Sequence, residues 1–379
     1  MHQFDFLIVG AGIAGAGIAL ELAGNARIAV LEREAFPGYH TTGRSAALFS
    51  ESYGNAPIRA LTSGSRAFFE APPQGFTEHP LVTPRGCLFI AREDQLAALE
   101  DHRRISPPSV EMLDRDAVRR LIPSLRADYL AAGLLDASVM DIDVHALHQG
   151  FLRGARSAGA RLVTSAEVED VSRRDGVWQV TSTAGAFAAP ILINAAGAWA
   201  EELGAMAGTR PIGLTPLRRT ALLIDPPADL AIGHWPAVID VDEEFYFKPD
   251  AGKLLVSPAD ETPSVPCDAQ AEELDMALGI DRMQKAIDLP VRRISRSWAG
   301  LRSFVADRTP VVGFDPQAEG FFWLAGQGGY GIQTAPAMAR LAAALARGEP
   351  VPGDLVALGV DRAALSPARL TAALQGAVR

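Results

Sequence analysis

The stretch Phe4-Asp5-Phe6-Leu7-Ile8-Val9-Gly10-Ala11-Gly12-Ile13-Ala14-Gly15 decides the fold of this chain. Its first six residues form a short apolar run that stops at a glycine, which is typical of a buried strand. The spacing of apolar residues from Ile13 to Ala23 predicts a helix directly after the glycines. A glycine-rich turn at that junction lets the backbone approach a pyrophosphate closely, at the positively polarised start of the helix.

The following residues complete a strand-helix-strand unit. Residues 27–31 read as a second buried strand, and Glu32 comes after it, 22 residues beyond Gly10. An acid at this point can accept hydrogen bonds from an adenosine ribose, so the unit predicts a dinucleotide site. A glycine-rich turn without a ligand is the alternative. Arg33 follows Glu32 directly, so a cofactor that carries a 2′-phosphate stays an alternative.

Composition narrows the class of protein. A chain of 379 residues favours two lobes, and 48% hydrophobic with 21% charged residues is ordinary for a globular enzyme. The net charge of -10 makes nucleic acid and anionic lipid poor partners. We therefore expect a small-molecule substrate and no nucleic acid.

Two cysteines, Cys87 and Cys267, are too few for a zinc cluster and suit a reducing compartment. The apolar stretch from Phe4 to Leu22 follows no basic segment and is interrupted by glycines, so we expect neither a signal peptide nor a transmembrane segment. The expected location is the cytoplasm, and peripheral attachment to the inner membrane stays open.

Two other chemistries are disfavoured. Asp141, Asp143, His145 and His148 have the short spacing of metal ligands, but acids at a helix start satisfy its free N–H groups without a metal, and we predict no metal site. A serine hydrolase has no support, because the chain lacks a G-x-S-x-G motif.

Further strands of the nucleotide-binding type occur at residues 190–194 and 321–325, with strand-rich segments between them. This order predicts an α/β fold: a discontinuous Rossmann-type dinucleotide-binding domain with an inserted antiparallel β-rich substrate domain. We assign residues 1–78, 141–210 and 297–379 to the dinucleotide-binding domain, and residues 79–140 and 211–296 to the substrate-binding domain.

A second glycine-rich turn favours FAD over NAD. Residues 326–334 join a buried strand to a helix with Pro336 in its first turn, a second helix N-terminus that can stabilise negative charge. Reduction of a flavin places such charge near N1 and the C2 carbonyl. In the earlier segment Gly43-Arg44-Ser45-Ala46-Ala47, Arg44 and Ser45 are candidates for binding the second phosphate or ribose.

Five segments together carry a family resemblance: the residue 10–15 fingerprint, residues 43–47, Asn194 to Trp199, Trp298 to Arg302 and Gly326 to Gln333. They resemble the D-amino-acid oxidase family of FAD enzymes. The likeness spans essentially the whole chain and, within the family, is to bacterial D-arginine dehydrogenase, including Pro37 to His40 and Phe245 to Asp250.

The resemblance implies a carboxylate clamp formed by Arg219 and Arg302, with Tyr53 and Tyr246 beside it and Gly329 and Gln333 beside the flavin and the substrate amine. A guanidinium offers a two-pronged donor set to a carboxylate. The side-chain pocket is expected to contain Leu48, Cys87, Ala237 and Ile239. The residues expected to contact FAD are Gly10, Gly12, Ile13, Ala14, Gly15, Glu32, Arg33, Gly43, Arg44, Ser45, Ala46, Ala47, Val168, Ala196, Gly197, Trp199, Gly300, Arg302, Gly328, Gly329, Tyr330, Gly331, Ile332 and Gln333.

Two positions depart from the arginine-specific pattern. Leu48 stands where a histidine is found there, and Cys87 where an acid meets the guanidinium. Both changes remove polarity, so we expect a substrate with a neutral side chain. With no cysteine near the C-terminal glycine-rich turn, FAD is expected to be held non-covalently.

The expected reaction is oxidative deamination of a D-amino acid, by hydride transfer from the α-carbon to flavin N5 and hydrolysis of the imino acid to a 2-oxo acid. An FAD-dependent 2-hydroxy-acid dehydrogenase is the nearest alternative. A non-catalytic flavin-binding or electron-transfer module is an alternative of another class. The sequence leaves oxidase or dehydrogenase open, with oxygen or a quinone as electron acceptor.

Overall fold

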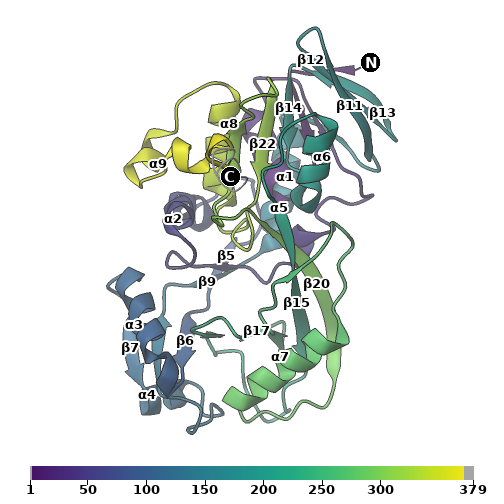
Figure 1. The fold of residues 1–379 in the computed structure, drawn as a ribbon. Helices are drawn as coiled ribbons and strands as arrows, with labels where there is room; N and C mark the ends of the chain where they lie inside the picture. The colour runs from purple at the N-terminus through teal and green to yellow at the C-terminus, as the bar shows by residue number, and fades with distance from the viewer. Residues whose placement is uncertain (1, 371–379) are drawn as a thin grey trace, which may run out of the picture.

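The computed structural model describes residues 2–370, which form two lobes (Figure 1). The first lobe is built on a six-stranded sheet of order β10-β3-β2-β14-β22-β21, in which only β21 runs antiparallel to its neighbour. Its strands are β2 (Phe6–Val9), β3 (Ile28–Leu31), β10 (Arg161–Val163), β14 (Ile191–Asn194), β21 (Val311–Phe314) and β22 (Phe321–Ala325). The sheet therefore combines segments from the start, the middle and the end of the chain.

Alternate residues of β2 pack into different layers, as a buried strand requires. Phe6 and Ile8 share a core with the helices α1 (Ile13–Leu22) and α8 (Ala335–Ala346). Leu7 faces the opposite core, which is covered by α6 (Ala200–Met206) and a small four-stranded sheet. That sheet consists of β1 (His2–Gln3), β11 (Val168–Arg174), β12 (Val177–Ser182) and β13 (Gly185–Ala189).

Four more helices complete this lobe. Contacts join α1 to α5 (Val144–Ser157) and α8 to α2 (Ala56–Glu70). The short helices α9 (Gly353–Ala357) and α10 (Arg362–Leu365) follow α8 in the chain. Asp143 caps α5 by accepting a hydrogen bond from the Ala146 amide at 2.8 Å. The other predicted cap, Asp141, instead pairs with Lys248 and Arg85, each at 2.6 Å.

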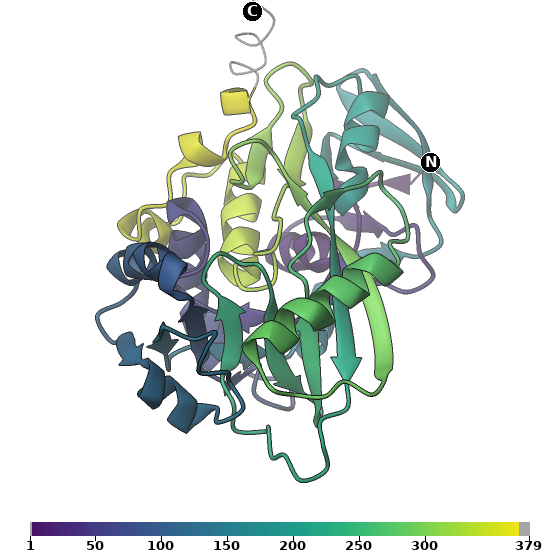
Figure 2. The ribbon, with the colours of Figure 1, turned by 60° about the horizontal axis from the view of Figure 1, so that its bottom comes forward.

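The second lobe contains a nine-stranded sheet of order β19-β15-β18-β17-β16-β6-β8-β7, with β20 paired to β15. Its strands are β6 (Cys87–Ala91), β7 (Glu111–Asp114), β8 (Ala132–Asp136), β15 (Thr215–Ile224), β16 (Ala237–Asp240), β17 (Tyr246–Asp250), β18 (Lys253–Ser257), β19 (Thr262–Pro263) and β20 (Ile294–Phe304). Its helices are α3 (Leu96–Ile105), α4 (Arg115–Leu121) and α7 (Glu273–Ala286), and Figure 2 shows α7 lying across the strands.

One face of this sheet packs against α4 and α7, through residues such as Leu88, Val238 and Phe247. The residues between them, including Phe89 and Ile239, point to the opposite side, toward the first lobe. At the junction lies a three-stranded sheet of β4 (Leu48–Phe49), β9 (Met140–Ile142) and β5 (Val82–Pro84). The two lobes thus meet over the inward face of the large sheet.

The expected α/β architecture is confirmed, with its Rossmann-like part and its additional sheets. The exact domain boundaries stay a prediction. Strand β20 runs across the boundary that was proposed between residues 296 and 297. Among residues 2–370, no helix is long and apolar enough to span a membrane.

Candidate active site

Three cavities follow one another where the lobes meet. The first and second share Gly12, Thr41 and Thr42, and the second and third share Arg219, Tyr246 and Arg302. The first two span about 950 and about 960 Å³ of space, part of which is open to solvent. Because neighbouring cavities share lining residues, the three form a continuous path that suits a ligand longer than one pocket.

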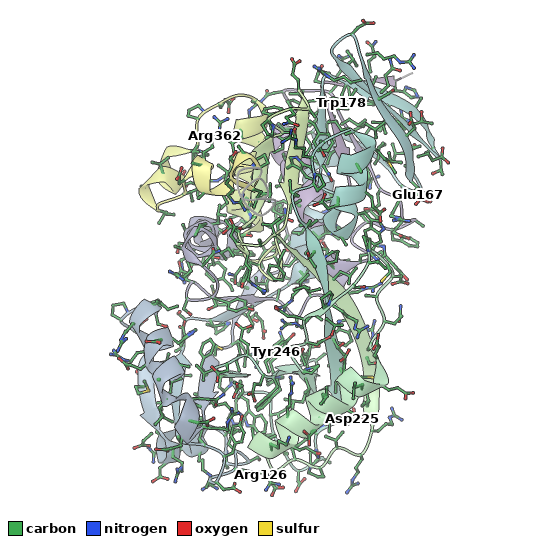
Figure 3. All side chains as sticks on the ribbon, in the orientation of Figure 1. Arg126, Glu167, Trp178, Asp225, Tyr246 and Arg362 are labelled. Carbon is green, nitrogen blue, oxygen red and sulfur yellow. The ribbon has the colours of Figure 1, made fainter. Side chains whose placement is uncertain are left out.

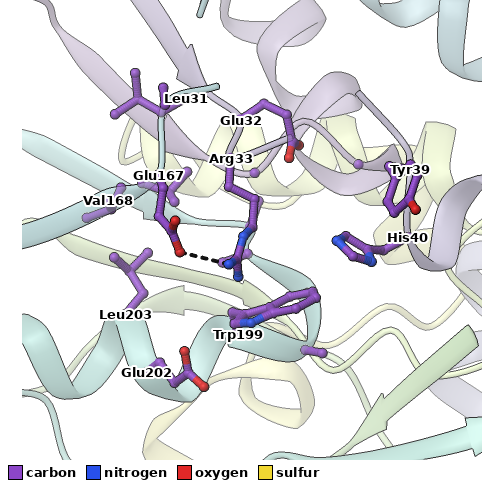
Figure 4. Close-up of a pocket in the computed structure, with 18 of the residues that line it drawn as sticks. Leu31, Glu32, Arg33, Tyr39, His40, Glu167, Val168, Trp199, Glu202 and Leu203 are labelled. Carbon is purple, nitrogen blue, oxygen red and sulfur yellow. Dashed lines mark hydrogen bonds and ion pairs between the residues drawn. The ribbon is translucent and has the colours of Figure 1, made fainter. Parts of the chain in front are cut away.

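The first cavity lies over the glycine-rich turn (Figure 4). The expected cofactor residues that line it are Gly10, Gly12, Glu32, Arg33, Val168, Ala196, Gly197 and Trp199. The Glu32 carboxylate accepts hydrogen bonds from the Ala11 amide at 2.8 Å and from the Glu34 amide at 3.0 Å. The acid expected at the ribose thus also holds the glycine-rich turn.

Arg33 is engaged by the protein on two sides. Its guanidinium pairs with Glu167 at 2.7 Å, drawn as a dashed line in Figure 4. It also lies 4.7 Å from the centre of the Trp199 ring, a favourable cation–π distance. These contacts give Arg33 a role in shaping the wall of the first cavity.

Close backbone packing explains two of the glycines. Gly10 has a φ of +100°, and a Cβ atom there would lie 2.3 Å from the Ala195 carbonyl oxygen. A Cβ atom on Gly15 would lie 1.9 Å from the carbonyl oxygen of Gly10. Gly15 lines none of the three cavities, so it acts by letting α1 start directly beneath the turn.

Two side chains that sequence reasoning did not assign also hold this turn. The Thr42 hydroxyl accepts a hydrogen bond from the Ile13 amide at 3.0 Å. The Nε2 atom of His148 lies 2.8 Å from the carbonyl oxygen of Ala11. Burial lowers the pKa of His148, so the neutral ring donates this bond. The Thr-Thr pair at 41 and 42 was the available sequence signal for the role of Thr42 in this turn. No neighbouring residue in the sequence indicates that His148 supports the turn.

The second cavity brings the two glycine-rich segments together. The expected residues that line it are Gly12, Ile13, Ala14, Arg44, Ser45, Ala46, Gly197, Gly300, Arg302, Gly328, Gly329, Gly331 and Ile332. Gly43 lies outside it; its amide donates to the Gly38 carbonyl at 2.8 Å. The turn that closes at Gly38 and Gly43 presents Arg44 and Ser45 to the cavity.

Arg44, expected to bind the second phosphate or ribose, is already engaged within the protein, and its contact with the cofactor stays a prediction. Its guanidinium pairs with Asp268 and donates to the carbonyl oxygens of Ala269 at 2.7 Å and Ala299 at 2.9 Å. These partners lie on the substrate-lobe side of the chain. Arg44 therefore joins the two lobes, and binding of a phosphate is not needed to satisfy it.

The third cavity, of about 780 Å³, contains both arginines of the expected clamp. In the antiparallel pairing of β15 with β20, Arg219 lies opposite Gly300 and Leu217 lies opposite Arg302. Directly paired residues point to the same side of a sheet, so the two guanidiniums share the inward face. Gly300 adds no side chain between them.

Arg302 sits close to Gly329, where a Cβ atom would approach its Nη1 atom to 2.9 Å. Tyr53 and Tyr246 are among the groups that interact electrostatically with its guanidinium. Although burial opposes its charge, the neighbouring Tyr53 and Tyr246 keep the pKa of Arg302 above its ordinary value. Burial raises the pKa of Tyr53 far above its ordinary range, so a protonated phenol faces a charged guanidinium at neutral pH.

The other predicted catalytic residues fall around this pair. Tyr246 lies in the middle of the molecule, where the lobes meet (Figure 3), and lines the second and third cavities. Gln333 lines the third cavity, and its amide donates to Thr62 at 2.9 Å. Tyr330 lines none of the cavities and packs against Tyr53, with 4.9 Å between ring centres.

The wall expected to face the substrate side chain is mostly apolar. Leu48, Cys87 and Ile239 line the third cavity as expected, as does the expected cofactor residue Ala47. Ala237, which is paired with Cys87 in the sheet and equally buried, does not line it, contrary to expectation; its side chain is a single methyl group. Burial raises the pKa of the Cys87 thiol, aided by the nearby charge of Asp136, so this wall is neutral at that point.

Sequence reasoning missed one acid. Glu243, in the exposed turn between β16 and β17, lines the third cavity. The two other acids near this region are used elsewhere: Glu51 pairs with Arg66, and Asp240 accepts a hydrogen bond from Tyr129 at 3.0 Å. Four of the five residues from Asp240 to Glu244 are acids, so nothing in the sequence distinguishes Glu243 from its neighbours.

A long dinucleotide cavity that opens onto a pocket with two inward arginines defines a flavin-dependent oxidoreductase of the two-lobed type. The family model described as FAD dependent oxidoreductase (DAO) matches residues 5–345. The chain belongs to this family, and FAD is its cofactor.

Individual relatives agree with this assignment. Glycine oxidase of Geobacillus kaustophilus is 26% identical over 375 residues, covering 95% of this chain and 97% of the relative. Its crystal structure has a TM-score of 0.82, at 25% identity, and covers 96% of this chain and 99% of that one. The hydrogen cyanide synthase subunit HcnC of Pseudomonas aeruginosa is 26% identical, over 98% of this chain and 99% of the relative.

An FAD-bound L-α-glycerophosphate oxidase from Mycoplasma pneumoniae has a TM-score of 0.82 at 19% identity, covering 92% of this chain and 95% of that chain; at this identity it shows the fold alone. The family model carries the family assignment, and the relatives agree with it. They do not support the finer likeness to D-arginine dehydrogenase that the motifs suggested.

Proposed function

We propose that the protein catalyses oxidative deamination of a small α-amino acid, with preference for the D-enantiomer of a neutral residue. The observation that carries the proposal is that Arg219 and Arg302 line the same cavity as Tyr246 and open onto the cavity of the C-terminal glycine-rich turn. Bound FAD supplies the two-electron acceptor for the oxidation.

The chain's own residues bind and orient the substrate. The two guanidiniums hold the carboxylate, and a charge-assisted hydrogen bond of this kind contributes about 1.5–3 kcal/mol. Fixing the carboxylate at one end limits where the α-carbon can lie, which is the main catalytic contribution expected of positioning residues. The apolar wall of Leu48, Cys87 and Ile239 leaves the side chain in a neutral environment.

The names of the relatives favour an amine substrate. They include glycine oxidases and a sarcosine oxidase subunit, whose named substrates are small amino acids. The preference for D-enantiomers rests on the motif resemblance alone. Glycine and N-methylglycine are therefore part of any substrate panel.

Oxidation of a 2-hydroxy acid remains the second candidate, because the same arginines would bind its carboxylate. That reaction needs a base for the hydroxyl proton. No histidine lines the described third cavity, and its one acid, Glu243, lies in an exposed turn. The non-catalytic alternative leaves the paired arginines of this cavity without a role.

The test is a product assay with an artificial electron acceptor and a panel of D-amino acids, L-amino acids, glycine, N-methylglycine and 2-hydroxy acids. We expect ammonia and a 2-oxo acid in equal amounts from neutral D-amino acids. Turnover of 2-hydroxy acids alone, without ammonia, would overturn the proposal.

A further inference from the structure

The two arginines of the clamp are held in different ways. Arg302 lies beside Tyr53 and Gly329 and has no ion-pair partner among the described residues, whereas Arg219 donates from Nη2 to the carboxylate of Glu261 at 3.1 Å. Arg219 is only 7% exposed, and its Nε atom is buried without a hydrogen-bond partner. One side of this guanidinium is thus anchored in protein while the residue lines the substrate cavity.

Glu261 is itself anchored from the other side. Arg308 donates to its Oε1 atom at 2.7 Å and to its Oε2 atom at 3.0 Å. The guanidinium of Arg308 also lies 3.9 Å from the centre of the Phe304 ring. Arg219 and Arg308 therefore bind the same carboxylate oxygen, and Glu261 separates two like charges.

This arrangement has two opposing effects on a carboxylate ligand. The negative charge of Glu261 disfavours a second carboxylate nearby, but the two bonds from Arg308 neutralise much of that charge. Against this, fixing a free arginine side chain costs rotamer entropy, and an anchored one has lost that freedom before the ligand arrives. With Glu261 absent, Arg308 would also repel Arg219. With much of the Glu261 charge neutralised, we expect the positioning effect to be the larger of the two.

We propose that Glu261, braced by Arg308, is a positioning residue that holds Arg219 ready for the substrate carboxylate. This inference rests on the proposed function, in which Arg219 binds that carboxylate. Glu261 takes no part in the oxidation itself.

The experiment compares the wild-type holoenzyme with Glu261→Gln, which keeps the shape of the side chain and removes its charge. The Kd of a simple monocarboxylate, propionate, is measured from the change in the flavin spectrum, and KM and kcat are measured for the best substrate. We expect the Kd and KM to rise by about 5–10-fold, the effect of mobilising one arginine. We expect kcat to change by less than twofold and flavin content to be unchanged.

Asp307→Asn is the matched control. It also removes one acid from the neighbouring segment, but Asp307 pairs with Arg369 at 2.8 Å and not with Arg219. This variant should bind propionate as the wild type does. If Glu261→Gln does not fold, Arg308→Gln provides the second test, because it removes the brace and should raise the Kd in the same direction.

An unchanged or lower Kd in Glu261→Gln would overturn the inference, and a lower value would show that Glu261 competes with the ligand. Arg219→Gln separates this failure from failure of the proposed function. If Arg219→Gln weakens propionate binding and Glu261→Gln does not, only the inference fails. If Arg219→Gln has no effect, the clamp itself is wrong.

Discussion

Arg219 and Arg302 lie 83 positions apart in the chain, and the antiparallel pairing of β15 with β20 brings them to one face of one sheet. Composition alone would have favoured a surface ion pair for Arg219, in a chain with 45 acidic residues. The family resemblance, not the local pattern, identified them. Their common position in the third cavity supports the proposed carboxylate clamp.

Replacing either arginine with glutamine should weaken substrate binding and leave FAD in place. Losing a charge-assisted hydrogen bond of about 1.5–3 kcal/mol corresponds to a roughly 10- to 150-fold loss of affinity. KM for the substrate and the flavin-to-protein ratio are the measurements. Normal substrate binding by Arg302→Gln would remove that residue from the site.

The second residue-scale prediction concerns Cys87, which lines the third cavity beside Leu48. Wild-type enzyme should have a higher kcat/KM for neutral D-amino acids than for D-arginine, because burial of an unpaired cation costs several kcal/mol. Cys87→Glu should raise the ratio of D-arginine to neutral kcat/KM by about tenfold or more relative to Cys87→Gln.

Equal ratios in Cys87→Glu and Cys87→Gln would mean that position 87 does not contact the substrate side chain. A wild type that already prefers D-arginine would instead assign the recognition of its charge to Glu243, the acid at this cavity. That residue was not predictable, since its placement depends on the turn between β16 and β17 and not on its neighbours in sequence.

Among the elements, the glycine-rich turn and its flanking strands were predicted almost to the residue, because local apolar runs and glycines encode them. The predicted helix at 13–23 is observed as Ile13–Leu22. The supports of the turn were not predictable. His148 reaches Ala11 from α5, across 137 positions of sequence, and only the packing of α5 on α1 brings them together.

Because His148 of α5 supports the glycine-rich turn, we predict that the stability of the protein depends on pH. The ordinary pKa of a histidine is 6.5, and burial lowers the pKa of His148 below this value in the folded protein. Below pH 6.5 the unfolded chain therefore binds more protons than the folded one. Stability should fall as the pH drops below about 6.5, and bound FAD should be released more readily. His148→Gln retains a donor and cannot titrate, so its acid-side loss of stability should be less steep.

Melting temperature and FAD release between pH 5 and 8 are the measurements for this variant, roughly the range over which a histidine titrates. His102 shifts in the same direction and stays in both proteins, so the comparison isolates His148. Identical acid-side curves for the variant and the wild type would show that His148 is not the sensitive group.

For the whole molecule, the sequence predicted the class of fold and the discontinuous sheet, because both follow from the order of strands along the chain. It could not predict the junction of the lobes. There Arg44 is engaged by Asp268 and backbone carbonyls, and Ala237, paired with Cys87 in the sheet, does not line the third cavity. Both outcomes depend on how the lobes pack, which no local pattern records.

The purified protein should be yellow and release its FAD on heating or acid treatment. No cysteine or histidine, the side chains best suited to a covalent link, lines the described second cavity. The measurement is the distribution of flavin absorbance between supernatant and precipitate after denaturation. Flavin that stays with the denatured chain would contradict non-covalent binding.

The central claim, oxidation of an amino acid bound by two arginines, is tested most directly by anaerobic mixing of the holoenzyme with single substrates. We predict that a neutral D-amino acid bleaches the visible flavin band faster than its L-enantiomer or the matching 2-hydroxy acid. Arg302→Gln, with its FAD retained, should bleach far more slowly at the same concentration. Bleaching by the 2-hydroxy acid alone, or equal bleaching of wild type and Arg302→Gln, would contradict the account.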